Sequence, residues 1–131
     1  MPAVIDTCVL IWASLNPGRL SKRAVAALAN NGNYFSHVSL LELAIKCATG
    51  QIKLQLDGKR ASAGKFILNA AQHLRLEQLP LDFNDIQVIE TLPYHHKDPF
   101  DRLLVCQCRV RGLPVISPDK QLDAYEIMRI W

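Results

Sequence analysis

Short apolar runs alternate with helical patterns from one end of the chain to the other, and this alternation constrains the fold more than any other feature. Residues 3–5 form the first apolar run, and residues 7–15 have the spacing of a helix. Strands that alternate with helices build βαβ units, whose strands pair in parallel and whose helices cover both faces of the sheet. We therefore predict an α/β fold, a three-layer α/β/α sandwich with a mostly parallel central sheet.

Turn and capping residues divide the chain into successive elements. The helix at residues 99–111 is the clearest, since Asp98 stands at its N-cap, Pro99 at its first position and Gly112 just past its end. The predicted strands cover residues 3–5, 34–38, 76–81, 113–117 and 127–130. The predicted helices cover residues 7–15, 20–29, 39–49, 61–74, 82–92 and 99–111, with a short further helix that ends at Tyr125.

The composition is that of an ordinary globular domain. The chain has 131 residues, of which 50% are hydrophobic and 21% are charged, which is enough to build one core. We predict a single domain over residues 1–131. The net charge of +3 is compatible with a nucleic-acid partner but does not require one.

The cysteines and the N-terminus indicate a cytoplasmic protein without a membrane segment. No C-x-x-C pair occurs among Cys8, Cys47, Cys106 and Cys108, so we interpret all four as small buried apolar residues in a reducing compartment. The N-terminal apolar stretch lacks a basic region and is interrupted by Asp6, unlike a secretion signal. No apolar run approaches the roughly 20 residues of a membrane span.

Four acids stand where predicted helices begin. Asp6 and Asp119 follow predicted strands, and Glu42 and Asp101 fall in the first turn of the helices at residues 39–49 and 99–111. In a parallel α/β sheet, ligands bind beyond the carboxyl ends of the strands. The four side chains are therefore candidates for one shared site.

Helix capping is the competing interpretation for each acid, since acids are favoured at helix N-termini. Ser39 and Glu42 match a capping box, and Asp98 and Asp101 form a similar pair. The two acids that follow strands fit N-caps or solvated turns.

The surroundings of two acids weigh against capping as the whole explanation. Asp101 shares a helical stripe with Leu104, Val105 and Cys108, which places it on an inward face. Asp6 is likewise flanked by apolar residues. Acids held together in a half-buried site repel and raise one another's pKa. A divalent cation resolves this conflict, and oxygen ligands suit Mg²⁺ or Mn²⁺.

The motifs around these acids resemble those of the PIN-domain ribonucleases, in particular the VapC-type toxins of bacterial toxin–antitoxin pairs. The run HKDPFDR at residues 96–102 is the most specific match. The other matching segments are residues 5–12, 39–46, 92–95, 103–104, 113–119 and 130–131. They follow the family's order at both ends of the chain, whereas residues 51–90 match only in general pattern.

The resemblance implies a catalytic metal site for Mg²⁺, which Mn²⁺ can replace. Its ligands map onto Asp6, Glu42, Asp101 and Asp119, with Asp6 and Asp101 ranked first. Asp98 is either a further ligand or only a helix cap.

Two hydroxyls and one thiol lie beside these acids in the sequence. Thr7 and Ser117 resemble family positions that help to bind metal, water or substrate. The family often has His where this chain has Cys8, a position that we interpret as structural.

The implied activity is metal-dependent hydrolysis of RNA by the toxin of a type II toxin–antitoxin system. One or two Mg²⁺ ions can activate the attacking water, neutralise charge at phosphorus and stabilise the leaving oxygen. The products would carry a 5′-phosphate and a 3′-hydroxyl. The implied partners are the RNA substrate, a cognate antitoxin that inserts a basic side chain among the acids, and a second copy of the chain in a homodimer.

Several other positions have two open interpretations. Lys46 contacts substrate phosphate or forms an i,i+4 pair with Glu42, and Arg102 could meet RNA or a partner. The helix at residues 61–74 uses its apolar residues for an interface or for the core. A loose basic region either steers RNA or is a solvated face, and it comprises Lys53, Lys59, Arg60 and Lys65.

Three other functions compete with this one. A metal-independent ribonuclease would use His95 and His96 for acid–base catalysis. These histidines could also be metal ligands, although a structural role in their loop is the favoured interpretation. A catalytically inactive PIN-like module would bind RNA or protein, against which the four intact acids argue. A phosphatase of the haloacid-dehalogenase type needs a second Asp two residues after Asp6, where Cys8 stands, and is rejected.

Overall fold

Five short strands form a parallel sheet at the centre of the computed structural model, which describes residues Met1 to Trp131. Every neighbouring pair of strands is parallel, and β1 lies in the middle. The order is β5-β2-β1-β6-β7, for β1 (Val4–Ile5), β2 (Tyr34–Ser36), β5 (Glu77–Leu79), β6 (Val115–Ile116) and β7 (Arg129–Ile130). The predicted parallel α/β sheet is confirmed.

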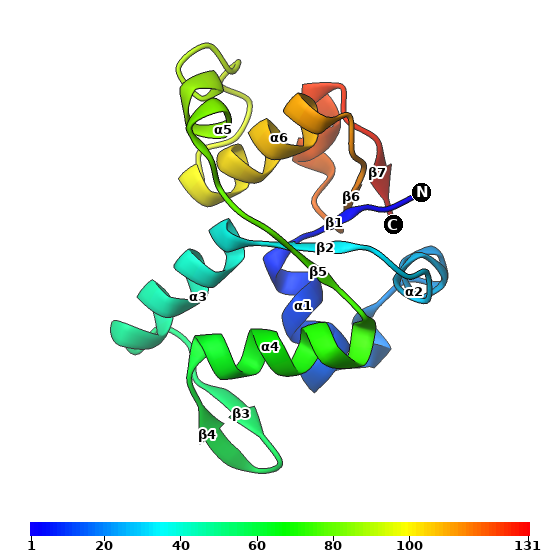
Figure 1. Ribbon diagram of the computed structural model, residues 1–131, viewed down its shortest axis with the longest axis vertical. Helices are drawn as coiled ribbons and strands as arrows, with labels where there is room; N and C mark the ends of the chain where they lie inside the picture. The colour runs from blue at the N-terminus through cyan, green and yellow to red at the C-terminus, as the bar shows by residue number, and fades with distance from the viewer.

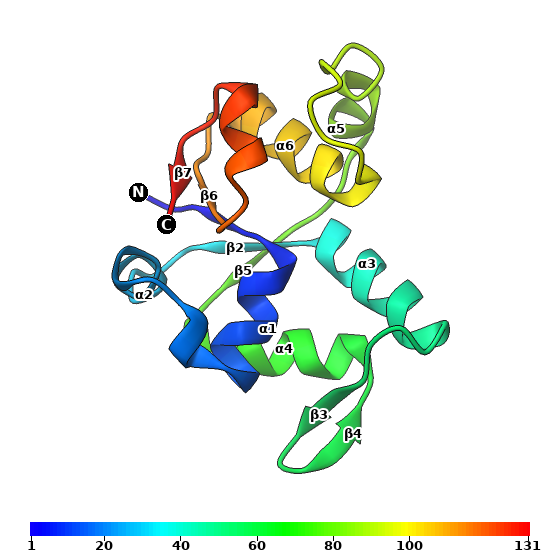
Figure 2. The same cartoon turned by 180° about the vertical axis from the view of Figure 1, so that it is seen from behind.

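Helices cover both faces of this sheet (Figure 1). They are α1 (Thr7–Leu15), η1 (Pro17–Arg19), α2 (Lys22–Leu28), α3 (His37–Ala48), α4 (Ala63–Leu74), α5 (Phe83–Val88), α6 (Pro99–Arg111) and η2 (Lys120–Tyr125), where η denotes a 3-10 helix. Figures 1 and 2 show α1, α3 and α4 on one side of the sheet and α5 and α6 on the other, the predicted three layers. No helix is both long enough and apolar enough to cross a membrane.

The pleat of the strands divides the interior into two hydrophobic cores. Ile5, Phe35 and Ile116 point toward α1 to α4, whereas Val4 and Val115 point toward α6 and η2. Successive side chains of a strand point to opposite faces, and both faces are covered here. The strands therefore read as continuous apolar runs, which is typical of a parallel sheet.

One wrong boundary moves a candidate site residue. The strand predicted at residues 34–38 ends at Ser36, and α3 begins at His37. The Ser36 hydroxyl caps α3 by accepting a backbone N–H of its first turn. The capping box predicted from Ser39 to Glu42 therefore does not form, and Glu42 lies in the second helical turn rather than the first.

A hairpin that the sequence interpretation missed stands between α3 and α4. Strands β3 (Leu54–Leu56) and β4 (Lys59–Ala61) pair antiparallel. Asp57 and Gly58 join them with φ values of 52° and 74°, as both central residues of a type I′ turn require. The Asp-Gly pair was the available signal. Ala61, predicted to begin a helix, belongs to β4 instead.

The remaining boundary differences are shortenings. The structure shortens the strands predicted at residues 3–5, 76–81, 113–117 and 127–130 and the helices predicted at residues 20–29 and 82–92. Apolar residues at these ends pack on the cores from loop conformations, so the apolar pattern extends beyond the regular element. The predicted helices at residues 7–15 and 99–111 have the observed bounds. The short helix predicted to end at Tyr125 is the 3-10 helix η2.

The apolar stripe of α4 belongs to the core, which decides between the two interpretations of this helix. Phe66, Ile67 and Ala70 are at most 1% exposed, and Leu74 packs partly buried against the same core.

All four cysteines are free thiols, but only two are fully buried. Cys106 and Cys108 lie inside the core, as predicted, whereas Cys8 and Cys47 are half-buried. The prediction of full burial is therefore wrong for the latter pair.

We expect Phe66→Ala to lower the free energy of unfolding by about 3–5 kcal/mol, because it removes a ring from a packed core. Leu68→Ala in the same helix is the matched control, since Leu68 is 58% exposed, and it should cost less than about 1 kcal/mol. Urea denaturation of both variants measures the difference. Equal losses would contradict the assignment of this stripe to the core.

Candidate active site

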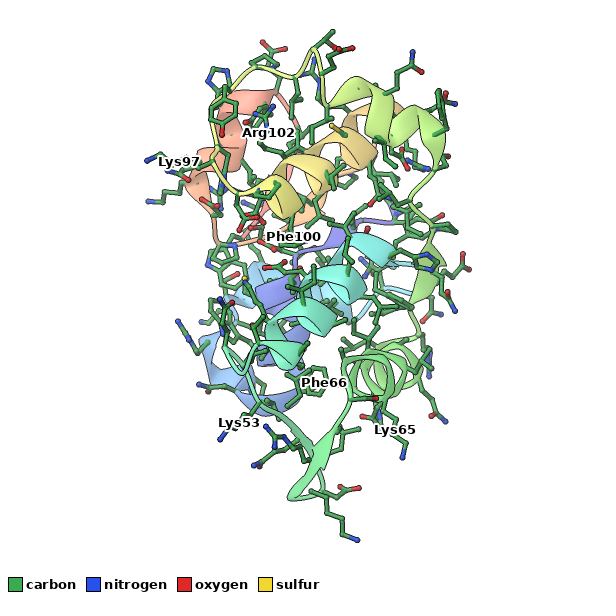
Figure 3. All side chains as sticks on the ribbon, turned by 90° about the vertical axis from the view of Figure 1, so that its left-hand side faces the viewer. Lys53, Lys65, Phe66, Lys97, Phe100 and Arg102 are labelled. Carbon is green, nitrogen blue, oxygen red and sulfur yellow. The ribbon has the colours of Figure 1, made fainter.

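The carboxyl ends of β1 and β6 and the N-terminal parts of α3 and α6 enclose a polar pocket of about 220 Å³. The structure places all four predicted acids in its lining: Asp6, Glu42, Asp101 and Asp119. They come from four separate segments that the parallel sheet brings to one edge. Figure 3 views this side of the molecule, with Phe100 and Arg102 marking α6 above α3.

Asp6 is held by a hydroxyl from the neighbouring strand. It stands at the N-cap of α1 but makes no side-chain capping bond, so the capping interpretation is wrong here. Ser117 Oγ instead donates to Asp6 Oδ2 at 2.5 Å and accepts the backbone N–H of Asp119 at 3.1 Å. Ser117 therefore fixes two of the acids relative to each other.

Glu42 has one engaged and one unpartnered oxygen. Lys46 Nζ donates to Oε2 at 2.6 Å. Of the two interpretations of Lys46, the structure contains the i,i+4 pair with Glu42. Oε1 is buried and has no hydrogen-bond partner. A buried carboxylate oxygen without a partner is costly, so this atom marks a position where a cation would be stabilised.

Asp98 and Asp101, at the start of α6, have different roles. Asp98 caps the helix, with Oδ1 accepting the N–H of Phe100 at 2.8 Å. Asp101 does not complete a capping box with it. The closest ion-pair partner of Asp101 is His96, whose Nε2 lies 3.3 Å from Asp101 Oδ2. The helix therefore directs Asp101 into the pocket, free of the capping role.

Asp119 is at once a helix cap and a member of the pocket. Its Oδ1 accepts the N–H of Gln121 at 3.0 Å, and its Oδ2 lies 2.7 Å from His96 Nε2. Candidate ligand atoms of His96, Asp101 and Asp119 lie within 4.8 Å of one another. Asp6 lines the same pocket but is outside this tight group.

Burial and mutual repulsion raise the pKa of two of the acids. Burial is the largest cause for Asp101, whose pKa rises to about 7. The charges of Asp6, Asp98 and Glu42 add to this rise, while His96 opposes it. Burial also raises the pKa of Asp6, against the effect of the hydrogen bond that it accepts. The pocket therefore holds more negative charge than it keeps easily at neutral pH.

The donor set fits a hard divalent cation. The unpartnered oxygen of Glu42 and the carboxylates of Asp6 and Asp101 offer only oxygen ligands, as Mg²⁺ and Mn²⁺ prefer. Cys8 lines the pocket, but burial first and the charge of Asp6 second raise the pKa of its thiol. Its thiol is the only sulfur in a lining whose other candidate ligands are oxygens.

The hydroxyl of Thr7 is engaged within the protein. Thr7 Oγ1 lies 2.8 Å from Ser39 Oγ, and both are buried. This contact joins α1 to α3 at the pocket, which Thr7 also lines. A direct role of Thr7 or Ser117 toward metal, water or substrate stays a prediction.

Arg102 does not face the pocket, and the expectation that it meets RNA or a partner is wrong. Its side chain is buried, donates to the carbonyls of Pro93 and Leu92 at 3.0 and 3.3 Å, and lies over the ring of Tyr94. Arg102 therefore anchors the loop that leads into α6.

His96 lies beside the pocket and contacts two of its acids, whereas the sequence interpretation favoured a structural role for it. The backbone N–H groups of His95 and His96 both donate to the Tyr125 hydroxyl, at 3.0 and 2.8 Å. This anchor lets the His96 ring reach Asp119. The predicted structural role describes His95, whose ring packs on Tyr125, but is incomplete for His96. Its place two residues before the cap of α6 was the available signal.

We expect Asp101→Asn to stabilise the metal-free protein at pH 8. Because the folded-state pKa of Asp101 is raised to about 7, ionising it costs stability as the pH rises from about 4 through about 7. The amide removes this cost, on the order of 1–4 kcal/mol. Thermal unfolding in EDTA should show a higher Tm than wild type at pH 8 and a smaller difference at pH 5. Asp57→Asn in the exposed hairpin turn is the control, and a Tm below wild type at pH 8 would contradict the expectation.

Comparison with known proteins places this geometry in a family. The family model described as PIN domain matches residues 3–127. A chain in the crystal structure of VapBC2 from Rickettsia felis aligns with a TM-score of 0.68 at 12% identity, covering 98% of this chain and 97% of that one. A chain in DNA-bound VapBC from Salmonella typhimurium gives 0.67 at 15%, covering 98% and 96%. One in FitAcB from Neisseria gonorrhoeae gives 0.62 at 19%, covering 97% and 95%.

The two kinds of comparison carry different weight. The structural likenesses have identities at which only the fold is shared. No curated protein sequence matches the chain. The family model, in contrast, runs from before β1 to beyond η2. The chain therefore belongs to the PIN domain family.

Proposed function

We propose that this chain is a metal-dependent ribonuclease and the VapC-type toxin of a type II toxin–antitoxin pair. The observation that carries the proposal is the buried, unpartnered Oε1 of Glu42 in a pocket that Asp6, Asp101 and Asp119 also line. A module that only binds RNA or protein would gain nothing from gathering these charges in a half-buried pocket, since the gathering is costly without a cation.

We assign the pocket residues separate roles in phosphodiester hydrolysis. A bound Mg²⁺ or Mn²⁺ would supply an activated water and neutralise charge at the scissile phosphate. Asp6, Glu42 and Asp101 would hold it, while Ser117 keeps Asp6 oriented and Lys46 leaves one oxygen of Glu42 free. The water oxygen would bond to phosphorus as the P–O3′ bond breaks. The water would lose a proton and O3′ would gain one, which leaves a 5′-phosphate and a 3′-hydroxyl.

Two lysines flank this pocket and support a polyanionic substrate. Lys97 stands between His96, which contacts a pocket acid, and Asp98. Lys53 follows Ile52, which lines the pocket. Both are exposed, and neither takes part in any ion pair of the structure. In Figure 3 both lie toward the left of the view, whereas Lys65 lies to the right. A strand that crosses the pocket would have a lysine on either side.

The proposal of an antitoxin partner is supported by the similarity of this fold to chains in solved structures. Solved structures of similar fold include those of VapBC and FitAcB, which agrees with a VapC-type toxin. A basic side chain of an antitoxin inserted among the carboxylates would neutralise them as a metal would. We propose the homodimer and the cytoplasmic location on the same analogy.

We expect the purified protein to cleave a mixed RNA pool with Mg²⁺ or Mn²⁺ and not in excess EDTA. Asp6→Asn and Asp101→Asn should each lower the rate by about 100-fold or more, because each removes a ligand charge from the metal that neutralises the transition state. Product ends are mapped by 3′-end ligation. Asp57→Asn on the hairpin is the control and should cleave at the wild-type rate.

Other outcomes of this assay contradict the proposal in distinct ways. Cleavage that survives EDTA and leaves a cyclic phosphate would identify a metal-independent ribonuclease. RNA binding without cleavage under any metal, with Asp6→Asn binding equally well, would identify the non-catalytic module.

We expect Lys53→Ala and Lys97→Ala each to weaken binding of a non-cleavable RNA and to reduce the salt dependence of its Kd. Each lost phosphate contact should lower the slope of log Kd against log salt by about 0.7–0.9. Fluorescence anisotropy at several salt concentrations measures the slope. Lys65→Ala is the matched control, and an equal effect at all three lysines would indicate only a general charge effect.

A further inference from the structure

Three hydrogen bonds hold His96 in one orientation. Its backbone N–H donates to the Tyr125 hydroxyl at 2.8 Å. Its Nδ1 accepts the backbone N–H of Asp98 at 3.1 Å. Its Nε2 lies 2.7 Å from Asp119 Oδ2. Both ring nitrogens are therefore engaged, and the ring is about 10% exposed.

The bond to Nδ1 decides which ring nitrogen carries the proton. The donor there is a backbone amide, so Nδ1 must accept, and the ring proton lies on Nε2. Nε2 then donates to Asp119 and has no lone pair to offer a metal. A metal-binding imidazole normally donates its other N–H to a carboxylate or carbonyl, the reverse of this arrangement. Closeness to Asp101 and Asp119 alone therefore does not make His96 a ligand.

Asp119 differs from the other acids in having both oxygens engaged. Gln121 N–H binds Oδ1, and His96 binds Oδ2. Glu42, in contrast, keeps a buried oxygen without any partner. Asp119 is also more exposed, with a side chain at 30% against 19% for Asp101 and 7% for Glu42. To bind a metal directly, Asp119 would have to share an oxygen that already accepts a hydrogen bond from His96 or Gln121, whereas Glu42 offers an oxygen with no partner.

We propose that His96 is a positioning residue that holds Asp119 outside direct contact with the metal. This inference rests on the proposed function and deepens it. Asp6, Glu42 and Asp101 are then the direct ligands, and Asp119 acts through water. The backbone amide of Asp98 and the hydroxyl of Tyr125 keep the His96 ring in place for this task.

The first test follows the His96 ring itself. Protein with ¹⁵N-labelled histidine is examined by NMR without metal and saturated with Mg²⁺, and the His96 signals are assigned by their loss in His96→Gln. We expect the proton on Nε2 in both states. A proton that moves to Nδ1 when Mg²⁺ binds would show that Nε2 ligates the metal and would overturn the inference.

The second test measures Mn²⁺ binding by calorimetry, without any substrate. Asp101→Asn should raise the Kd by about 30-fold or more, because the number of ligand charges sets the affinity of an oxygen site. Asp119→Asn should raise it by less than about fivefold, the effect of a charge held one water away. A loss at Asp119 equal to that at Asp101 would overturn the inference and leave the nuclease proposal standing. Absence of Mn²⁺ binding in wild type would instead sink both.

The third test uses variants of His96. His96→Leu removes the donor, whereas His96→Gln keeps an N–H that can reach Asp119. We expect kcat for RNA cleavage to fall in His96→Leu with little change in KM and to recover partly in His96→Gln. His73→Gln, at an exposed histidine of α4 that does not line the pocket, is the matched control. Equal kcat in His96→Leu and wild type would overturn the positioning role.

Discussion

Negative charge gathered at the ends of two neighbouring parallel strands is the constraint on which the rest of this structure depends. The sheet brings Asp6 and Asp119 to one edge, and α3 and α6 add Glu42 and Asp101. Such a group repels itself in a half-buried pocket. Neighbouring polar groups reduce this repulsion by hydrogen bonding to individual carboxylate oxygens, as Ser117 does for Asp6. One buried oxygen of Glu42 has no hydrogen-bond partner.

The loop that leads into α6 is held in place by hydrogen bonds from Arg102 and to Tyr125. Arg102 is buried but binds carbonyls of the preceding loop rather than a carboxylate. Tyr125, from η2, accepts two backbone N–H groups of the same loop. The guanidinium of Arg102 is thus stabilised by the carbonyl dipoles of the loop and by the face of the Tyr94 ring. Arg102 follows Asp101 in the sequence, but it stabilises the loop that leads into α6 rather than lining the pocket.

The sequence predicts what depends on local patterns and on the general rule for parallel sheets. The bounds of α6 follow from Asp98 and Gly112, and the gathering of the acids follows because parallel strands end at one edge. The end of β2 could not be placed, since Val38 extends the strand-like pattern although Ser36 already caps α3. The contact of His96 with Asp119 spans 23 residues and depends on how Tyr125 anchors a loop. No local pattern encodes such a contact.

The half-buried thiol of Cys8 has a consequence for oxidative chemistry. A thiol at the edge of an enzyme pocket is often a point of attack by peroxide or alkylating agents, which react with the thiolate. Here burial, and then the charge of Asp6, keep the proton on sulfur. Burial, the larger cause, persists when a cation neutralises the acids. Burial is therefore the main protection of this sulfur, and Cys8 should react slowly with peroxide or alkylating agents whether or not a cation is bound.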